Sequence, residues 1–277
     1  MPLSPAMAPQ IHLLGRPFVV RDGAAHAVPR GRKAWGLLAY LLLSERAPGR
    51  EQLAGLLFGE ADDPQRALRW NLAELRTLLG DPALLQGEPP AQALPPGTRV
   101  DTGILASGDW REALALPGLD RELLEGMAFD TSPAFEAWLL VERRHLATLS
   151  QGVLREGVEA HAARNEFPSA LRLAARLVAL DPLSEDAQEL LIRTLVRSGD
   201  RTAAERQLAA CRELFRRELG VEPGRAVLAA AKGALPAARA SSPSPQAARA
   251  ALEAGAAAIA AGTLDAGLGM VQLVCRL

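Results

Sequence analysis

The sequence is poor in aromatic residues, cysteine and lysine. Aromatic side chains make up only 4% of the 277 residues, whereas 49% are hydrophobic, most of them Ala and Leu. Because such side chains lose little rotamer freedom in a helix, the composition predicts a mainly α chain with a small β component. The same apolar content, with 23% charged residues, is typical of a globular protein and argues against disorder as the main state.

Cysteines and long apolar runs are too few to indicate disulfides or a membrane span. Cys211 and Cys275 cannot form a disulfide framework, and each falls in an apolar helical pattern that favours a small buried side chain. No stretch has the form of a secretory signal or of an apolar span of about 18 residues. The sequence therefore predicts a cytoplasmic protein with no membrane partner.

Motifs for catalysis are missing as well. Lys33 is followed by Ala34 and Lys232 by Gly233, so neither belongs to a P-loop, which requires Gly-Lys-Ser/Thr. The four histidines show no metal-ligand spacing, and no serine lies in a Gly-x-Ser-x-Gly elbow. We therefore expect no enzyme activity, no catalytic residues, no metal and no cofactor.

The charges that are present are unevenly distributed. The whole chain carries a formal charge of -1, whereas residues 1–80 contain ten basic and seven acidic residues and carry +3. The remaining residues therefore carry -4. This asymmetry indicates that a negatively charged partner such as nucleic acid binds the N-terminal third.

The N-terminal residues predict a flexible tail and a small sheet. Residues 1–10 show no periodicity, as is common for a chain terminus. Short apolar runs at Ile11–Leu14, Phe18–Val20 and around Val28 are separated by turns that contain glycine. These runs predict an antiparallel meander.

Helical patterns follow the sheet. The leucines between residues 37 and 42 repeat at the spacing of a buried helix face, and Pro48-Gly49 ends this first helix. A second, short helix is expected to begin near Arg50 and to end before Gly59.

The third helix has the clearest boundaries. Asp63 can cap its free backbone N–H groups, and Gly80 can close it, so we expect it at Pro64–Leu79. Its leucines fall within a narrow arc of the helical wheel. Residues 84–101 predict a β-hairpin, and residues 11–105 together predict a winged helix-turn-helix domain that binds DNA.

The side of the third helix opposite its leucines is the candidate DNA-binding surface. Arginine offers a planar donor fork to guanine or phosphate, and asparagine can pair with adenine. A basic cluster at the start of the first helix is suited to a phosphate. The candidates are Arg66, Arg69, Trp70, Asn71, Ala73, Arg76 and Thr77 on the third helix, Arg30, Arg32 and Lys33 at the first, and Arg99 in the hairpin. The alternative is a solvated helix face in a repeat protein.

Residues 106–235 are expected to form tetratricopeptide-like helical repeats. An internal offset of 34 residues is visible, and in this architecture each helix pair buries its apolar face against a neighbour. Residues 236–246 predict a linker, and residues 247–277 predict a partial further helix pair. The positions that match at this offset are Ala170 with Ala204, Leu180 with Leu214, and Asn165-Glu166 with Gly199-Asp200.

Two parts of the sequence resemble a known family. The run VPRGRKAWGLLAYLLLSERAPGREQLAGLLFGEADDPQRALRWNLAELRTLLG from Val28 to Gly80 resembles the DNA-binding domain of the SARP family of bacterial transcriptional activators, an OmpR-like winged helix. The run SPAFEAWLLVERRHL at Ser132–Leu146 and the stretch Ala179–Gly224, which closes with ELGVEPG, look like the bacterial transcriptional activator domain of that family.

The resemblance implies an activator that binds direct repeats in double-stranded promoter DNA. The helix at Pro64–Leu79 would enter the major groove, and the hairpin at residues 84–101 would touch the minor groove or the backbone. The helical repeats would mediate self-association or contact RNA polymerase. Glu74 departs from the family, which often has arginine there. Two alternatives stay open, a tetratricopeptide-like interaction scaffold with weak or lost DNA binding and the regulatory front end of a longer regulator.

Overall fold

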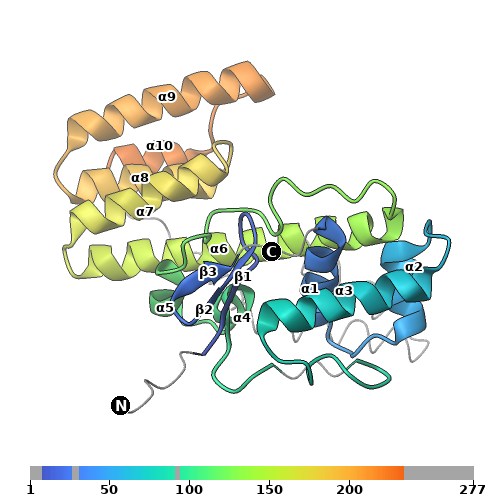
Figure 1. Ribbon diagram of the computed structural model, residues 1–277. Coiled ribbons are helices and arrows are strands. Elements are labelled where there is room, and N and C mark those ends of the chain that lie inside the picture. Colours follow the sequence, from blue (N-terminus) through green and yellow to red (C-terminus); the bar gives the residue numbers. More distant parts are fainter. Residues whose placement is uncertain (1–7, 27–30, 91–93, 234–277) are drawn as a thin grey trace, which may run out of the picture. The chain divides into compact units, whose positions relative to one another are not determined.

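The computed structural model describes residues 8–26, 31–90 and 94–233, and the chain divides into two compact units at Pro182–Leu183 (Figure 1). The expected linker and the expected further helix pair after it lie outside the described residues, as do Val28 and Arg30. The described chain is mainly helical with one small sheet, which confirms the predicted fold class.

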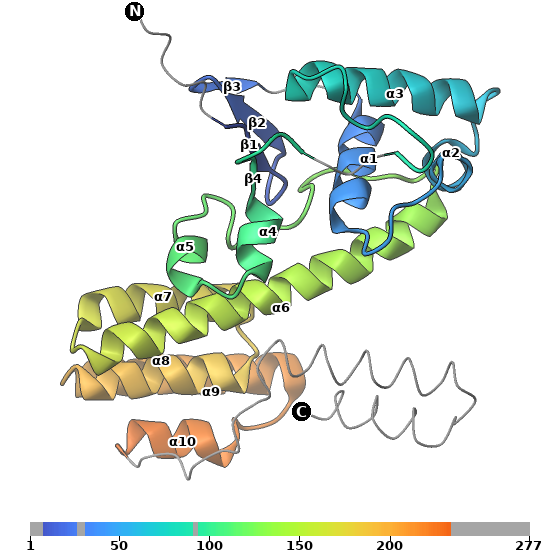
Figure 2. The same cartoon turned by 90° about the horizontal axis from the view of Figure 1, so that it is seen from below.

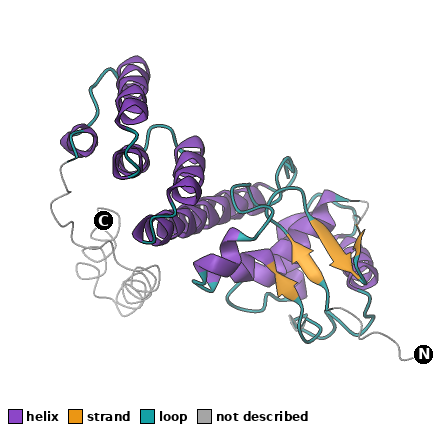
Figure 3. Cartoon of the chain, turned by 90° about the vertical axis from the view of Figure 1, so that its left-hand side faces the viewer, coloured by secondary structure: helices purple, strands orange, loops and turns teal. Residues whose placement is uncertain are grey.

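The sheet contains the predicted antiparallel meander. Strand β1 (Gln10–His12) pairs with β2 (Phe18–Arg21), which pairs with β3 (Ala24–His26), and both pairings are antiparallel. The third strand therefore lies a few residues before the position around Val28 that the sequence predicted. A fourth strand, β4 (Arg99–Val100), runs parallel to β1 and gives the order β3-β2-β1-β4. The strands are drawn in orange in Figure 3.

The expected hairpin at residues 84–101 is wrong for the residues that the structure describes, since β4 is their only strand. Two arginines instead bond to backbone carbonyl groups of this segment. Arg76 donates from Nε to the Leu84 carbonyl at 2.8 Å and from a terminal nitrogen to the Leu85 carbonyl at 3.0 Å. Arg50 donates from Nε to the Gly87 carbonyl at 2.9 Å. The segment is therefore held as turns against the helices.

Three helices follow the meander at the predicted places. They are α1 (Arg32–Leu43), α2 (Arg50–Phe58) and α3 (Pro64–Leu79). The Asp63 carboxylate accepts a hydrogen bond from the Arg66 backbone N–H at 2.8 Å, as expected of a capping residue. The leucine arc of α3 is buried, so the opposite side of this helix faces outward.

The sheet continues directly into two short helices, α4 (Asp101–Ala106) and α5 (Trp110–Leu114). The Asp101 carboxylate, only 3% exposed, accepts hydrogen bonds from the backbone N–H groups of Leu13 and Leu14 at 2.8 Å each. Burial raises the pKa of Asp101 above its usual range, although these bonds oppose the effect. The start of α4 is thereby tied to the end of β1.

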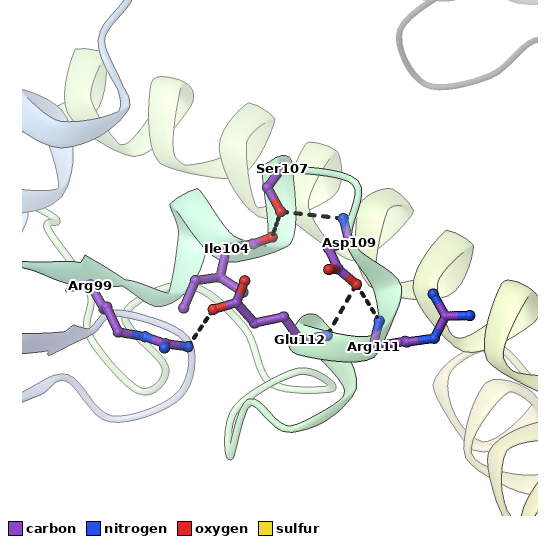
Figure 4. A network of polar contacts seen from close by, with 6 residues as sticks. All are labelled: Arg99, Ile104, Ser107, Asp109, Arg111 and Glu112. Atoms are coloured by element: carbon purple, nitrogen blue, oxygen red, sulfur yellow. Dashed lines mark hydrogen bonds and ion pairs between the residues drawn. The ribbon is translucent and has the colours of Figure 1, made fainter. Parts of the chain in front are cut away.

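A network of polar contacts fixes the β4–α4–α5 connection (Figure 4). The Asp109 carboxylate accepts from the Arg111 backbone N–H at 2.9 Å and so caps α5, while Arg99 forms an ion pair with Glu112. Ser107 donates from its hydroxyl to the Ile104 carbonyl at 2.7 Å. These contacts are local, so they set the path of the chain after the sheet.

The long helix α6 (Pro133–Ala163) completes the core around α1. Phe135 is fully buried, and its ring lies 4.6 Å from that of Phe129 in an edge-on arrangement. A Cβ added at Gly36 of α1 would lie 2.7 Å from Phe129 and 3.0 Å from Phe135, so glycine is needed for this close approach. The aromatic rings of Tyr40 and Trp138, 4.8 Å apart, extend the contact.

The other end of α6 packs against α5 and α7 (Phe167–Leu180), as Figure 2 shows. Gly157 allows this approach, because a Cβ there would lie 2.9 Å from Leu173 and 3.0 Å from Leu114. One continuous helix therefore contributes both to the three-helix core and to the first helix pair.

The second unit contains α8 (Glu185–Arg197), α9 (Arg201–Leu219) and α10 (Arg225–Ala231). The starts of α7 and α9 are 34 residues apart, and so are the ends of α6 and α8. The repeat period read from the sequence therefore corresponds to successive helix pairs, as predicted.

The ELGVEPG run connects α9 to α10. Gly220 ends α9 in the left-handed conformation at φ 70°, which favours glycine. Glu222 then pairs with Arg216 at 3.0 Å and with Arg212 at 3.3 Å. The Gly224 backbone N–H donates to Glu185 at 3.0 Å, which fixes the start of α10 against α8.

Cys211 is buried in the core of this second unit, as predicted, and we expect its thiol to be inert. Burial, with a smaller effect from the charge of Glu185, raises the pKa of Cys211 from 9.0 to about 11. Because the thiolate is the reactive form, a shift of this size lowers the reactive fraction at pH 8 about 100-fold.

Iodoacetamide labelling, followed by mass spectrometry of the peptide that contains Cys211, checks this prediction. We expect slow labelling of the native protein and fast labelling in urea. Equal rates in the two states would contradict the burial of the thiol.

Candidate nucleic-acid interface

The outer face of α3 consists of Arg66, Arg69, Trp70, Ala73 and Thr77, all of which are exposed. Trp70 is 55% exposed although it is the largest apolar side chain of the helix. We call this set the α3 outer face. It combines two guanidinium groups with an indole, on a helix whose opposite side is anchored in the core. The structure therefore brings together five of the predicted site residues.

Arg69 has a weak intramolecular partner. Its guanidinium lies 3.9 Å from the Asp63 carboxylate, and both side chains are more than half exposed. An exposed ion pair at this distance contributes little and is readily exchanged for another anion. Arg69 is therefore available to a phosphate or a base.

Asn71 does not lie on this face. Its side chain is only 6% exposed, and Nδ2 donates to the Ala67 carbonyl of the same helix at 2.9 Å. The adenine contact that the sequence suggested for Asn71 would require this side chain to leave its buried position.

Arg76 is also used within the protein. Its guanidinium bonds the carbonyls of Leu84 and Leu85, the two buried leucines that follow α3. The sequence placed this arginine on the flank of a DNA-binding helix, whereas the structure gives it a positioning role for the segment after that helix.

The basic cluster at the start of α1 is partly neutralised. Lys33 forms an ion pair with Glu60 and lies 5.5 Å from the centre of the Phe58 ring. The hydrogen bond from Lys33 is the main cause that lowers the pKa of Glu60. Arg32 is exposed, and Arg30 lies outside the described residues. Arg99 belongs to the sheet and pairs with Glu112, so the structure does not add it to the α3 outer face.

Two features of α3 escaped the sequence analysis. Arg21, from β2, donates to the carbonyls of Thr77 and Leu78 at 3.3 and 3.2 Å, where the last carbonyls of the helix lack partners. No local pattern predicts a contact across 56 residues. One oxygen of Glu74 is buried and, among the described residues, has no hydrogen-bond partner. The acidic group is therefore directed at the protein rather than at the outer face.

The fold and this face define a winged-helix-like protein with tetratricopeptide-like repeats. Residues 98–234 match the family described as bacterial transcriptional activator domain (BTAD). This match identifies residues 98–234 as such a domain, and the predicted resemblance to SARP-type bacterial activators is confirmed. The match begins at β4 and so includes residues 98–105, which the sequence analysis assigned to the first domain.

Comparison with solved structures shows the same fold in another protein. The structure titled "Mycobacterium tuberculosis EmbR in complex with low affinity phosphopeptide" is similar at a TM-score of 0.57 and 19% identity. The match covers 82% of this chain and 65% of the EmbR chain, so the chain spans less than two thirds of that protein. No match was found among curated proteins. In the part of the chain that the structure describes, no helix is long and apolar enough to cross a membrane.

Proposed function

We propose that the protein is a transcriptional activator that binds double-stranded promoter DNA through the α3 outer face. The observation that carries this proposal is the exposure of Arg66, Arg69 and Trp70 together, on a capped helix whose other side is buried in the core. A helix fits the major groove, and exposed arginines supply the phosphate and base contacts that such a helix needs.

Direct repeats would supply affinity that one such helix lacks. A single recognition helix reads few base pairs, and a second copy on an adjacent repeat raises the effective concentration of the first. We assign self-association or contact with RNA polymerase to the helices after β4. They offer exposed apolar side chains on α6, Leu140 at 70% and Val141 at 65% exposure, which suit a protein partner better than a duplex.

The variants Arg66→Ala and Arg69→Ala are expected to weaken DNA binding without a change in fold. Both side chains are exposed, so their loss leaves the core intact. Each lost phosphate contact lowers the slope of log affinity against log salt concentration by about 0.9, and a lost base contact costs about 1–3 kcal/mol at one position of the site.

Fluorescence anisotropy over a salt series measures both effects. Arg206→Ala removes an equally exposed arginine from α9 and serves as the control, with an unchanged slope. Affinities equal to wild type in both α3 variants would favour the alternative function, a protein-interaction scaffold. The exposed Leu140 and Val141, and the neutralisation of Lys33 by Glu60, are the observations that support that alternative.

A further inference from the structure

The centre of the α3 outer face is apolar. Trp70 and Ala73 lie side by side on it, with Arg66 one turn before Trp70 and Arg69 one turn before Ala73. An aromatic side chain of this size is usually buried, because an indole covers a large apolar area. Its exposure at the middle of a cationic face indicates a partner that offers both negative charge and apolar groups.

Thr77 extends the apolar centre by one turn. Its hydroxyl donates to the Ala73 carbonyl of the same helix at 3.1 Å, so the hydroxyl proton is already engaged. The γ-methyl group is the other branch of this exposed side chain. Thr77 therefore offers a ligand its methyl group, and its hydroxyl only as a hydrogen-bond acceptor.

Two side chains of α3 that could read bases by hydrogen bonds are engaged within the protein. The Asn71 amide is buried and bonded to the Ala67 carbonyl. Arg76 is bonded to the carbonyls of Leu84 and Leu85. Apolar contact is consequently the main kind of contact that Trp70, Ala73 and the Thr77 methyl group can make.

We propose that the apolar centre formed by Trp70, Ala73 and Thr77 reads the C5-methyl groups of thymines in the major groove. Thymine is the only standard base that presents a methyl group there, and alanine and threonine methyls and aromatic rings are the side-chain groups that contact it. Arg66 and Arg69 then hold the phosphates beside these bases. The inference rests on the proposed DNA-binding function and adds the chemical group that is recognised.

A duplex fits this surface better than a second protein does. The core of a protein-binding patch is apolar and contains few charged residues. On α3 the apolar groups lie next to the exposed guanidinium groups of Arg66 and Arg69, a mixture that suits a surface rich in phosphates.

Substitution of deoxyuridine for thymidine tests the proposal, because it removes the methyl group and leaves base pairing unchanged. The full-length protein first selects its preferred sequence from a randomised duplex library. Each thymidine of that sequence is then replaced singly by deoxyuridine, and affinity is measured at one salt concentration. We expect at least one position where the affinity falls about fourfold. A decrease of this size, about fourfold, is expected when the burial of one methyl-sized group is lost.

Two variants assign the effect to the apolar centre. Trp70→Ala is expected to bind the thymidine and deoxyuridine duplexes with nearly equal affinity. Arg66→Ala, the control, is expected to bind both duplexes more weakly and to retain the ratio between them. Circular dichroism verifies that both variants fold, as their exposure predicts.

The outcomes separate this inference from the proposed function. Specific binding that is indifferent to deoxyuridine at every position overturns the thymine proposal alone. The thymine proposal is also overturned if Trp70→Ala keeps the full wild-type ratio between its affinities for the thymidine and deoxyuridine duplexes. Failure of the wild-type protein to bind any duplex overturns the proposed function, and the thymine contact with it.

Discussion

Phe135→Ala is expected to lower the free energy of unfolding of the first unit by about 3–5 kcal/mol, the usual cost of deleting a fully buried phenylalanine side chain. Phe135 is 0% exposed and packs against the rings of Phe129, Tyr40 and Trp138. Its removal leaves a cavity beside Gly36, where the backbone of α1 comes closest to these rings. The helix α3, which carries the arginines proposed to bind DNA, shares this core through α1 and α2.

Urea denaturation followed by circular dichroism measures the change. Leu140→Ala removes an apolar side chain from the same helix, but one that is 70% exposed, so its effect is expected within about 0.5 kcal/mol. The slope of each transition reports whether the unit still unfolds cooperatively. If Phe135→Ala lowered the free energy of unfolding as little as Leu140→Ala does, α6 would not complete the core.

Gly118→Ala is expected to destabilise the first unit by about 3 kcal/mol or more, at the upper end of overpacking costs. An added Cβ would lie 2.3 Å from the Leu14 carbonyl oxygen and 2.9 Å from its carbonyl carbon. Backbone atoms cannot rotate away as a side chain can. These atoms are held in turn, because the flanking Leu13 carbonyl accepts from Leu124 at 2.9 Å and Gly15 donates to Glu122 at 2.7 Å.

Gly152→Ala is the matched control. Gly152 lies inside α6, and an added Cβ would meet nothing within 4 Å. Alanine is favoured over glycine in a helix, so this variant is expected to gain about 0.5–1 kcal/mol. Thermal or urea denaturation measures the change in the free energy of unfolding for each variant. A decrease for Gly118→Ala and an increase for Gly152→Ala would support the contacts described. Equal effects would show that the segment around Gly118 does not pack on β1.

Both destabilising substitutions lie beyond residue 105, where the sequence analysis ended the DNA-binding domain. That boundary stays a proposal, but the structure shows that the buried rings of Phe129 and Phe135 and the segment around Gly118 contribute to the same core. In the first unit, α3 and α6 are therefore held by one set of packed side chains. A partner that binds α6 would act on a body that includes α3, the helix proposed to bind DNA.

The sequence by itself determined the features that depend on near neighbours. The caps Asp63 and Gly80 set the ends of α3, and its leucine arc set the buried side, since capping and helical periodicity act within a few residues. The 34-residue period predicted where α7 and α9 begin. The exposure of Arg66 and Trp70 followed from the same periodicity.

Only the tertiary structure decided which of the polar candidates remain available. The leucine arc could not show that Asn71 bonds back to Ala67, or that Arg76 is taken by the carbonyls of the following segment. The contact of Arg21 with the end of α3 and the insertion of Phe135 beside α1 join residues far apart in the chain. Such contacts depend on how the elements pack, and propensity and spacing describe only the elements themselves.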